Sequence, residues 1–149
     1  MAGELSLDFG RRLRRLRQYS RLTEAEAARR SGLEADDWPE LESAATLPSA
    51  ERLQQVAAGL EVPEGLLRET PEALWLTWVG PDVDTHRFLQ DLSVMVRQSG
   101  FSDRRSACLY FLRKAAGYGG REMPEAGLRL LSDLLLGYAD ACRRSSRGD

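Results

Sequence analysis

The chain has 149 residues, of which 42% are hydrophobic and 30% charged, so it is long enough to bury a core in one domain or in two small ones. Its formal net charge of −2 is unusual for a dedicated nucleic-acid binder, so the positions of the charges matter. No run of about 18 apolar residues is present, and the N-terminal stretch lacks the core of a signal peptide. We therefore expect a cytoplasmic protein without a membrane span.

The cysteines and the single histidine offer little to a catalytic or metal site. Cys108 and Cys142 match no metal-binding spacing, so we expect both to be small buried side chains. His86 starts an expected helix without a Cys, Ser or acid constellation around it, and no P-loop lysine follows the glycines of residues 117–120. We expect no enzyme activity, no cofactor and no metal.

The first expected helix covers residues 7–18 and is rich in arginine. Leu7, Phe9, Leu13 and Leu16 recur at helical spacing and should face the core. Five arginines surround most of the helix, either as a solvated surface that pairs with acids or as phosphate contacts. They are Arg11, Arg12, Arg14, Arg15 and Arg17.

A second helix is expected over residues 24–30, followed by a tight turn. Thr23 and Glu26 form a capping box, in which each side chain satisfies a backbone amide at the helix start. Gly32 then stands where a corner between two helices needs a positive φ. The pattern predicts a helix, a short turn and another helix.

Residues 34–42, the acidic segment, contain five acids and no base. A helix that began at Ala35 would lose a hydrogen bond at Pro39 and clash there, at a cost of about 3 kcal/mol. With Asp37 as N-cap and Glu40 three residues later, Pro39 falls in the first turn, where it does no harm. We predict a short helix that begins near Trp38, with Trp38 in the core.

Two more helices complete the first half of the chain. Pro48 disfavours helical geometry in the preceding residue, and Ser49 caps a helix over residues 49–60. Residues 63–68 form a short fifth helix whose leucines close the core.

This order of elements resembles the Cro and phage-repressor (Xre-like) helix-turn-helix family over residues 10–67. The matching positions need no gap and are Leu13, Arg14, Arg17, Leu22, Thr23, Ala28, Gly32, Leu33, Trp38, Leu41, Glu42, Pro48, Ser49, Leu53, Ala57, Leu60 and Val62. The resemblance implies a five-helix repressor-like domain that docks on DNA as a dimer. Compared with that family, the helix near Trp38 should be about one turn shorter.

The resemblance also assigns roles to individual residues. It implies a structural ion pair between Arg17 and Glu42. It places Glu24, Ala35, Asp36 and Glu40 at the positions that face bases, where acids accept hydrogen bonds chiefly from cytosine. Phosphate contacts are expected from the remaining arginines of the first two helices, namely Arg11, Arg12, Arg14, Arg15, Arg29 and Arg30.

The second half of the chain matches no motif. Residues 72–79 are apolar nearly all round and are compatible with a helix or a strand. Residues 84–99 form an amphipathic helix that stops at Gly100. We expect Ser102 to cap the next helix, which extends to Gly117.

The end of the chain is also expected to be helical. Residues 118–122 are a glycine-containing loop, and Pro124 opens a last helix with a broad leucine stripe. From Arg143 onward we expect a frayed polar tail. The wide apolar stripes of this half predict a small bundle or a dimerisation surface.

The sequence thus predicts an all-α protein with a helix-turn-helix domain at residues 1–69 and a C-terminal helical domain at residues 70–149. The favoured function is a dimeric, DNA-binding transcriptional regulator of Xre-like type. The alternative keeps the fold without DNA binding: a protein-interaction module, such as an anti-regulator or DNA mimic, that uses acidic residues 34–42. Exposed acids favour the alternative, whereas acids neutralised by the first helix's arginines favour DNA binding.

Overall fold

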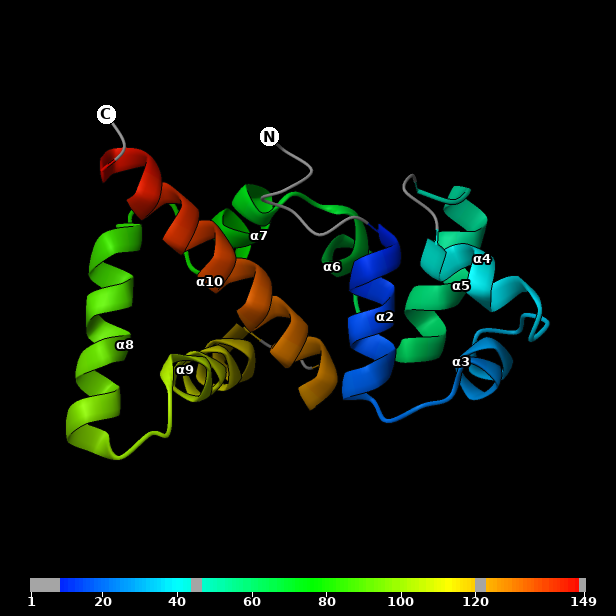
Figure 1. Cartoon of the computed structure of the whole chain (residues 1–149), viewed down its shortest axis with the longest axis horizontal. Helices are drawn as coiled ribbons and strands as arrows, with labels where there is room; N and C mark the ends of the chain where they lie inside the picture. The colour runs from blue at the N-terminus through cyan, green and yellow to red at the C-terminus, as the bar shows by residue number, and fades with distance from the viewer. Residues whose placement is uncertain (1–8, 44–46, 120–122, 148–149) are drawn as a thin grey trace. The chain divides into compact units, whose positions relative to one another are not determined.

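The structure, a computed structural model, describes residues 9–43, 47–119 and 123–147. These residues form nine α-helices and no strand, which confirms the all-α prediction (Figure 1). The helices group into two compact units. One unit consists of α2 to α6 and Met123–Leu130, and the other of α7, α8, α9 and α10 from Leu131 onward.

The first unit contains the five helices expected for a repressor-like domain (Figure 1). They are α2 (Phe9–Tyr19), α3 (Glu24–Arg30), α4 (Asp37–Ser43), α5 (Ala50–Leu60) and α6 (Glu64–Arg68). Helix α2 packs against α4 and α6, α3 packs against α4 and α5, and α5 packs against α6. This arrangement holds α4 against both α2 and α3.

The core of the first unit follows the predicted helical periodicity. Phe9, Leu13 and Leu16 of α2 are buried, whereas Leu7 lies outside the described residues. Helices α5 and α6 complete this core with Leu53, Val56, Ala57, Leu60, Leu66 and Leu67.

Two predicted caps are confirmed. Thr23 Oγ1 accepts a hydrogen bond from the Glu26 amide at 3.1 Å, and the Glu26 carboxylate accepts one from the Thr23 amide at 2.9 Å. These bonds to Thr23 lower the pKa of Glu26. At the start of α5, Ser49 Oγ accepts from the Arg52 amide at 3.2 Å.

The second unit is built from α7 (Pro71–Trp78), α8 (Thr85–Ser99), α9 (Arg104–Gly119) and most of α10 (Glu125–Arg147). Residues 72–79, left open by the sequence, are helical as far as Trp78. Thr70 Oγ1 caps this helix by accepting from the Ala73 amide, and Pro71 fits the first turn because its missing N–H needs no partner there. None of the helices in the described residues has the length and apolar character needed to span a membrane.

Aromatic contacts and ion pairs join the helices of the second unit. The Trp75 ring meets the Phe88 ring edge-on at a centroid distance of 5.0 Å, and Phe88 meets Phe111 in the same way at 5.3 Å. Helix α9 also forms two ion pairs with α10, Arg104 with Asp140 at 3.0 Å and Arg105 with Asp133 at 2.8 Å. Aromatic contacts thus connect α7, α8 and α9, and ion pairs connect α9 to α10.

Three details of this unit differ from the sequence prediction. At the start of α9 the Ser106 amide donates to the carboxylate of Asp103, not to Ser102, and this bond lowers the pKa of Asp103. Helix α9 extends to Gly119, so only residues 120–122 of the expected loop remain, and they lie outside the described residues. Helix α10 continues through the expected frayed tail to Arg147.

The prediction that both cysteines are buried holds for one of them. Cys108 is fully buried, and the loss of solvation raises the pKa of its thiol to about 11. Cys142 is only half-buried, because it lies near the exposed end of α10.

Candidate nucleic-acid interface

The turn between α3 and α4 has the backbone geometry of a Schellman helix end. The Gly32 amide donates to Arg29 O at 3.1 Å, and the Leu33 amide donates to Ala28 O at 2.8 Å. Gly32 has a φ of +71°, as predicted, which a side chain would disfavour. The chain therefore leaves α3 in a fixed direction toward α4.

Helix α5 approaches this turn so closely that only glycine fits. A Cβ atom on Gly59 would lie 2.5 Å from Ser31 Oγ, 2.7 Å from Ser31 Cα and 2.8 Å from Arg30 O. Two of these three atoms belong to the backbone and cannot rotate away. Gly59 thus allows α5 to support the turn from the inside.

The start of α4 confirms the effect predicted for Pro39. The helix begins at Asp37, one residue earlier than the predicted Trp38, so Asp37 is its first residue and not its cap. The Asp37 and Trp38 amides donate to Glu34 O at 3.0 Å and Ala35 O at 3.3 Å, which closes a turn ahead of the helix. Pro39 is the third helical residue, where its missing N–H does no harm.

The inner face of α4, defined as Trp38, Leu41 and Glu42, is buried. Glu42 Oε2 accepts from Arg17 Nε at 2.5 Å and from Trp38 Nε1 at 2.6 Å, and Oε1 accepts from Arg17 Nη2 at 3.2 Å. Arg14 Nε approaches Oε1 at 3.4 Å. The structure thus brings Arg17 and Glu42 together in a network that fastens α4 to α2.

The network keeps Glu42 ionised despite its burial. Burial raises the pKa of Glu42, but the hydrogen bonds from Arg17 and Trp38 outweigh it, so the pKa lies below its ordinary value. The hydrogen bond to Glu42 raises the pKa of Arg17 in turn. Arg17 Nη1 also donates to Leu22 O at 3.0 Å, which ties the end of α2 to the loop before α3.

The outer face, defined as Ala35 and Asp36 in the turn before α4 together with Glu40 in the helix, is exposed, as is Glu24 at the start of α3. These four are the positions that the family resemblance assigns to base contact. Glu34 is also exposed, and in the described part of the chain no ion pair involves Glu34, Asp36 or Glu40. The acidic segment therefore presents uncompensated carboxylates outward and one neutralised carboxylate, Glu42, inward.

Most of the arginines expected to contact phosphate are exposed, namely Arg11, Arg14, Arg15, Arg29 and Arg30. Arg12 is a correction to the prediction. Its side chain is 3% exposed, and its Nη1 donates to Leu66 O at 3.0 Å, so it connects α2 to α6 and cannot reach phosphate. Helical spacing explains this, because Arg12 lies on the side of α2 that carries Phe9, Leu13 and Leu16.

Sequence reasoning missed two parts of the α2–α4 network. The bond from Trp38 to Glu42 was detectable, because residues four apart lie on the same side of a helix. The approach of Arg14 to Glu42 was not, because it depends on the angle between α2 and α4. The contact of Gly59 with the turn is likewise a product of packing.

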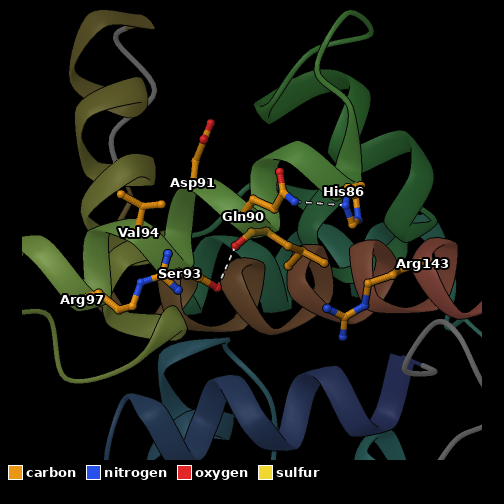
Figure 2. Close-up of a pocket in the computed structure, with 8 residues that line it drawn as sticks. His86, Gln90, Asp91, Ser93, Val94, Arg97 and Arg143 are labelled. Carbon is orange, nitrogen blue, oxygen red and sulfur yellow. Dashed lines mark hydrogen bonds between the residues drawn. The ribbon is translucent and has the colours of Figure 1, made fainter.

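The second unit has a polar hollow of about 410 Å³ beside α8. Figure 2 shows His86, Gln90, Ser93 and Arg97 along this helix, with Arg143 reaching in from α10. Two contacts within the hollow are between Gln90 Nε2 and His86 Nε2 at 3.2 Å and from Ser93 Oγ to Leu89 O at 3.1 Å. The His86 ring therefore contacts an amide side chain and not an acid or a nucleophile among the residues that line this hollow.

Comparison with known proteins agrees with the architecture of the first unit. Residues 8–70 match a family model described as a helix-turn-helix domain. No curated protein and no solved structure matches the chain. Residues 8–70, which hold the five helices α2 to α6, are thus similar to a helix-turn-helix domain.

Proposed function

We propose that this chain is a dimeric, DNA-binding transcriptional regulator of Xre-like type that acts in the cytoplasm. The observation that carries the proposal is the network of Arg17, Trp38 and Glu42. It fixes the inner face of α4 against α2 and leaves the outer face exposed. A helix held in this way can be presented to the major groove as a rigid body.

Phosphate contacts would come from the exposed arginines around α4. Arg29 and Arg30 end α3 immediately before the turn, and Arg11 and Arg15 are exposed on α2. Because affinity for DNA comes largely from cations that displace counterions, these side chains would supply most of the binding free energy. The outer face would then contribute selectivity, with Asp36 or Glu40 accepting from cytosine N4.

A charge-matched pair of variants tests this proposal. We expect Arg29→Ala/Arg30→Ala to weaken binding to a random-sequence duplex. The negative slope of log K against log salt should become shallower by about 2, or about 0.9 for each lost contact. The control, Arg87→Ala/Arg97→Ala, removes the same charge from exposed positions on α8 and should leave the slope unchanged. Equal slopes for the two variants would show that α3 does not contact phosphate.

Dimerisation through the C-terminal helices is the second part of the proposal. Paired half-sites on DNA require two-fold symmetry. The leucine stripe of α10 is buried within the chain, and the large apolar side chains left exposed after residue 70, among the described residues, are Leu76, Val83, Val94 and Tyr110. Sedimentation velocity at micromolar concentration should give a mass twice the 16.7 kDa of the chain. A monomer at about 100 μM, well above the Kd expected of a working regulator, would contradict this part.

One observation favours the alternative function, a protein-interaction module that does not bind DNA. Glu34, Asp36 and Glu40 are exposed and form no ion pair in the described part of the chain, so they offer an acidic surface to a basic partner. Under this alternative the chain would not bind duplex DNA even at low salt. Under the favoured function it would bind, and neutralising Asp36 and Glu40 would strengthen the binding to random-sequence duplex, where repulsion from phosphate outweighs any contact with cytosine.

A further inference from the structure

The second unit contains another hollow, of about 430 Å³, between α7, the residues that precede α8, and α10. Its volume falls within the usual range of small-molecule sites. Two of the large apolar side chains that line it are solvent-exposed, Leu76 at 50% and Val83 at 39%. Exposed apolar side chains that share one concave surface are typical of a binding site.

Aromatic residues form another part of the wall. The ring centroids of Trp75 and Tyr138 are 5.7 Å apart, with the two planes tilted by 46°. Trp75 is almost fully buried and is fixed from behind by Phe88, whereas Tyr138 is half-buried. The Tyr138 ring is therefore held in place but remains accessible from the hollow.

The charged groups at the hollow have one sign. Asp82 and Asp84 are both exposed and line it, and none of the described residues that line it is basic. Burial of the ring raises the pKa of the Tyr138 phenol, the hydrogen bond with Cys142 raises it further, and the negative charge of Glu72 makes a smaller contribution in the same direction. By contrast, the hollow beside α8 is lined by both signs of charge, with Asp91 beside Arg97 and Arg143 (Figure 2).

From this combination we propose that the hollow binds a lipophilic organic cation. The aromatic face of Tyr138 would attract the cation through its ring quadrupole, and Asp82 and Asp84 would supply the opposite charge. Leu76 and Val83 would cover the ligand's apolar groups. The C-terminal unit would thus recognise a class of compound, a role that does not depend on whether the first unit binds DNA.

Two probes of nearly the same shape and opposite charge test the proposal directly. We would titrate the full chain by isothermal calorimetry with tetraphenylphosphonium and, separately, with tetraphenylborate. We expect saturable binding of the phosphonium cation and at least about tenfold weaker binding of the borate anion, because the carboxylates attract one and repel the other. Equal binding of both probes, or no saturable binding of the cation up to millimolar concentration, would overturn the proposal.

Variants locate the binding within the chain. Asp82→Asn/Asp84→Asn should weaken phosphonium binding about tenfold. It should leave α8 folded. In the wild type the Asp84 carboxylate caps this helix by accepting from the Arg87 amide, and asparagine is an equally good cap. The control Asp91→Asn removes an exposed charge from α8 outside this hollow and should stay within about twofold of the wild type. If the Asp82/Asp84 variant bound the cation as tightly as the control does, the cation would not occupy this hollow.

A second variant tests the aromatic wall. Tyr138→Leu keeps an apolar side chain but removes the ring, and we expect about threefold weaker phosphonium binding. Circular dichroism would confirm that each variant is folded. Unchanged binding to folded Tyr138→Leu would remove the aromatic contact from the proposal.

Discussion

The two faces of α4 differ in how closely they follow the helix-turn-helix pattern. The inner face holds the ion pair that the resemblance implies, with Glu42 bonded to Arg17 and joined by Trp38, and it is buried. The outer face carries acids where such domains commonly carry hydrogen-bond donors, and it is exposed. The difference teaches that packing constrains the residues of the inner face whatever the domain binds. The residues of the outer face are constrained only by the partner that they contact.

The largest expected effect comes from breaking the inner face. Glu42→Ala leaves the charge of Arg17 and the indole N–H of Trp38 without their buried partner, so we expect a loss of about 3 kcal/mol or more in the free energy of unfolding. Glu40→Ala, on the exposed side of the same helix, should change that free energy by less than about 0.5 kcal/mol. Urea unfolding measures both, and similar values for the two variants would contradict the comparison.

The ion pair between Arg17 and Glu42 also predicts that the free energy of unfolding depends on pH. The pKa of Glu42 in the folded protein lies below its ordinary value of 4.5, so its stabilisation is complete above that value and is lost as the pH falls through the folded pKa. Unfolding free energies from pH 7 to pH 2.5 should therefore converge for wild type and Glu42→Gln as the pH decreases. A constant difference across this range would show that the pKa of Glu42 is the same in the folded and unfolded states, which would contradict the lowered pKa.

A smaller effect is expected from crowding the turn that leads into α4. Gly59→Ala places a methyl group within 2.8 Å of two backbone atoms of residues 30 and 31, and we expect a loss of about 1–3 kcal/mol. The matched control is Gly137→Ala in α10, where, apart from its chain neighbours and the backbone of its own helix, no atom of the described residues lies within 4 Å of the new Cβ. There alanine's helix propensity should stabilise the protein by up to about 1 kcal/mol. Thermal melts should shift in opposite directions, and a stabilising Gly59→Ala would refute the close approach of α5.

The capping box should give a smaller change still. Thr23→Ala removes the acceptor for the Glu26 amide at the start of α3, at an expected cost of about 1 kcal/mol. Thr23→Ser keeps the hydroxyl and should recover most of that loss in urea unfolding. If serine and alanine behaved alike, the capping hydrogen bond would make no measurable contribution.

The smallest expected effect is on the outer face. Asp36→Asn/Glu40→Gln removes two exposed carboxylates, so stability should not change and affinity for duplex DNA should rise about two- to fivefold. The control Asp82→Asn/Asp91→Asn removes the same charge from the other unit and should leave DNA affinity unchanged. The measurement uses random-sequence duplex, in which the acids mainly repel phosphate, and a lower affinity of the outer-face variant for that duplex would contradict this repulsion.

Local chemistry made much of the fold predictable. The capping box at Thr23, the positive φ of Gly32 and the late start of α4 at Pro39 each depend on residues within one turn of one another. The helix over residues 71–78 was ambiguous because it is apolar all round, so periodicity could not separate it from a strand.

The site was less predictable, because it depends on contacts between helices. The same helical spacing that identified Leu13 and Leu16 would have placed Arg12 near the core, but its charge led to a surface assignment. Its partner, the carbonyl of Leu66, lies 54 positions away in the sequence. The hollow near Trp75 and Tyr138 is lined by three segments that are distant in the sequence, so no local sequence pattern predicts it.

The measurement that tests the central claim most directly is fluorescence anisotropy of the wild-type chain with sheared genomic DNA across a salt titration. If the exposed arginines Arg11, Arg15, Arg29 and Arg30 each neutralise one phosphate, log K should fall against log salt with a slope of roughly −3 to −4 per protomer. Such a slope would support a DNA-binding regulator. No binding at low salt would contradict it and would leave the helix-turn-helix domain as a scaffold for a protein partner.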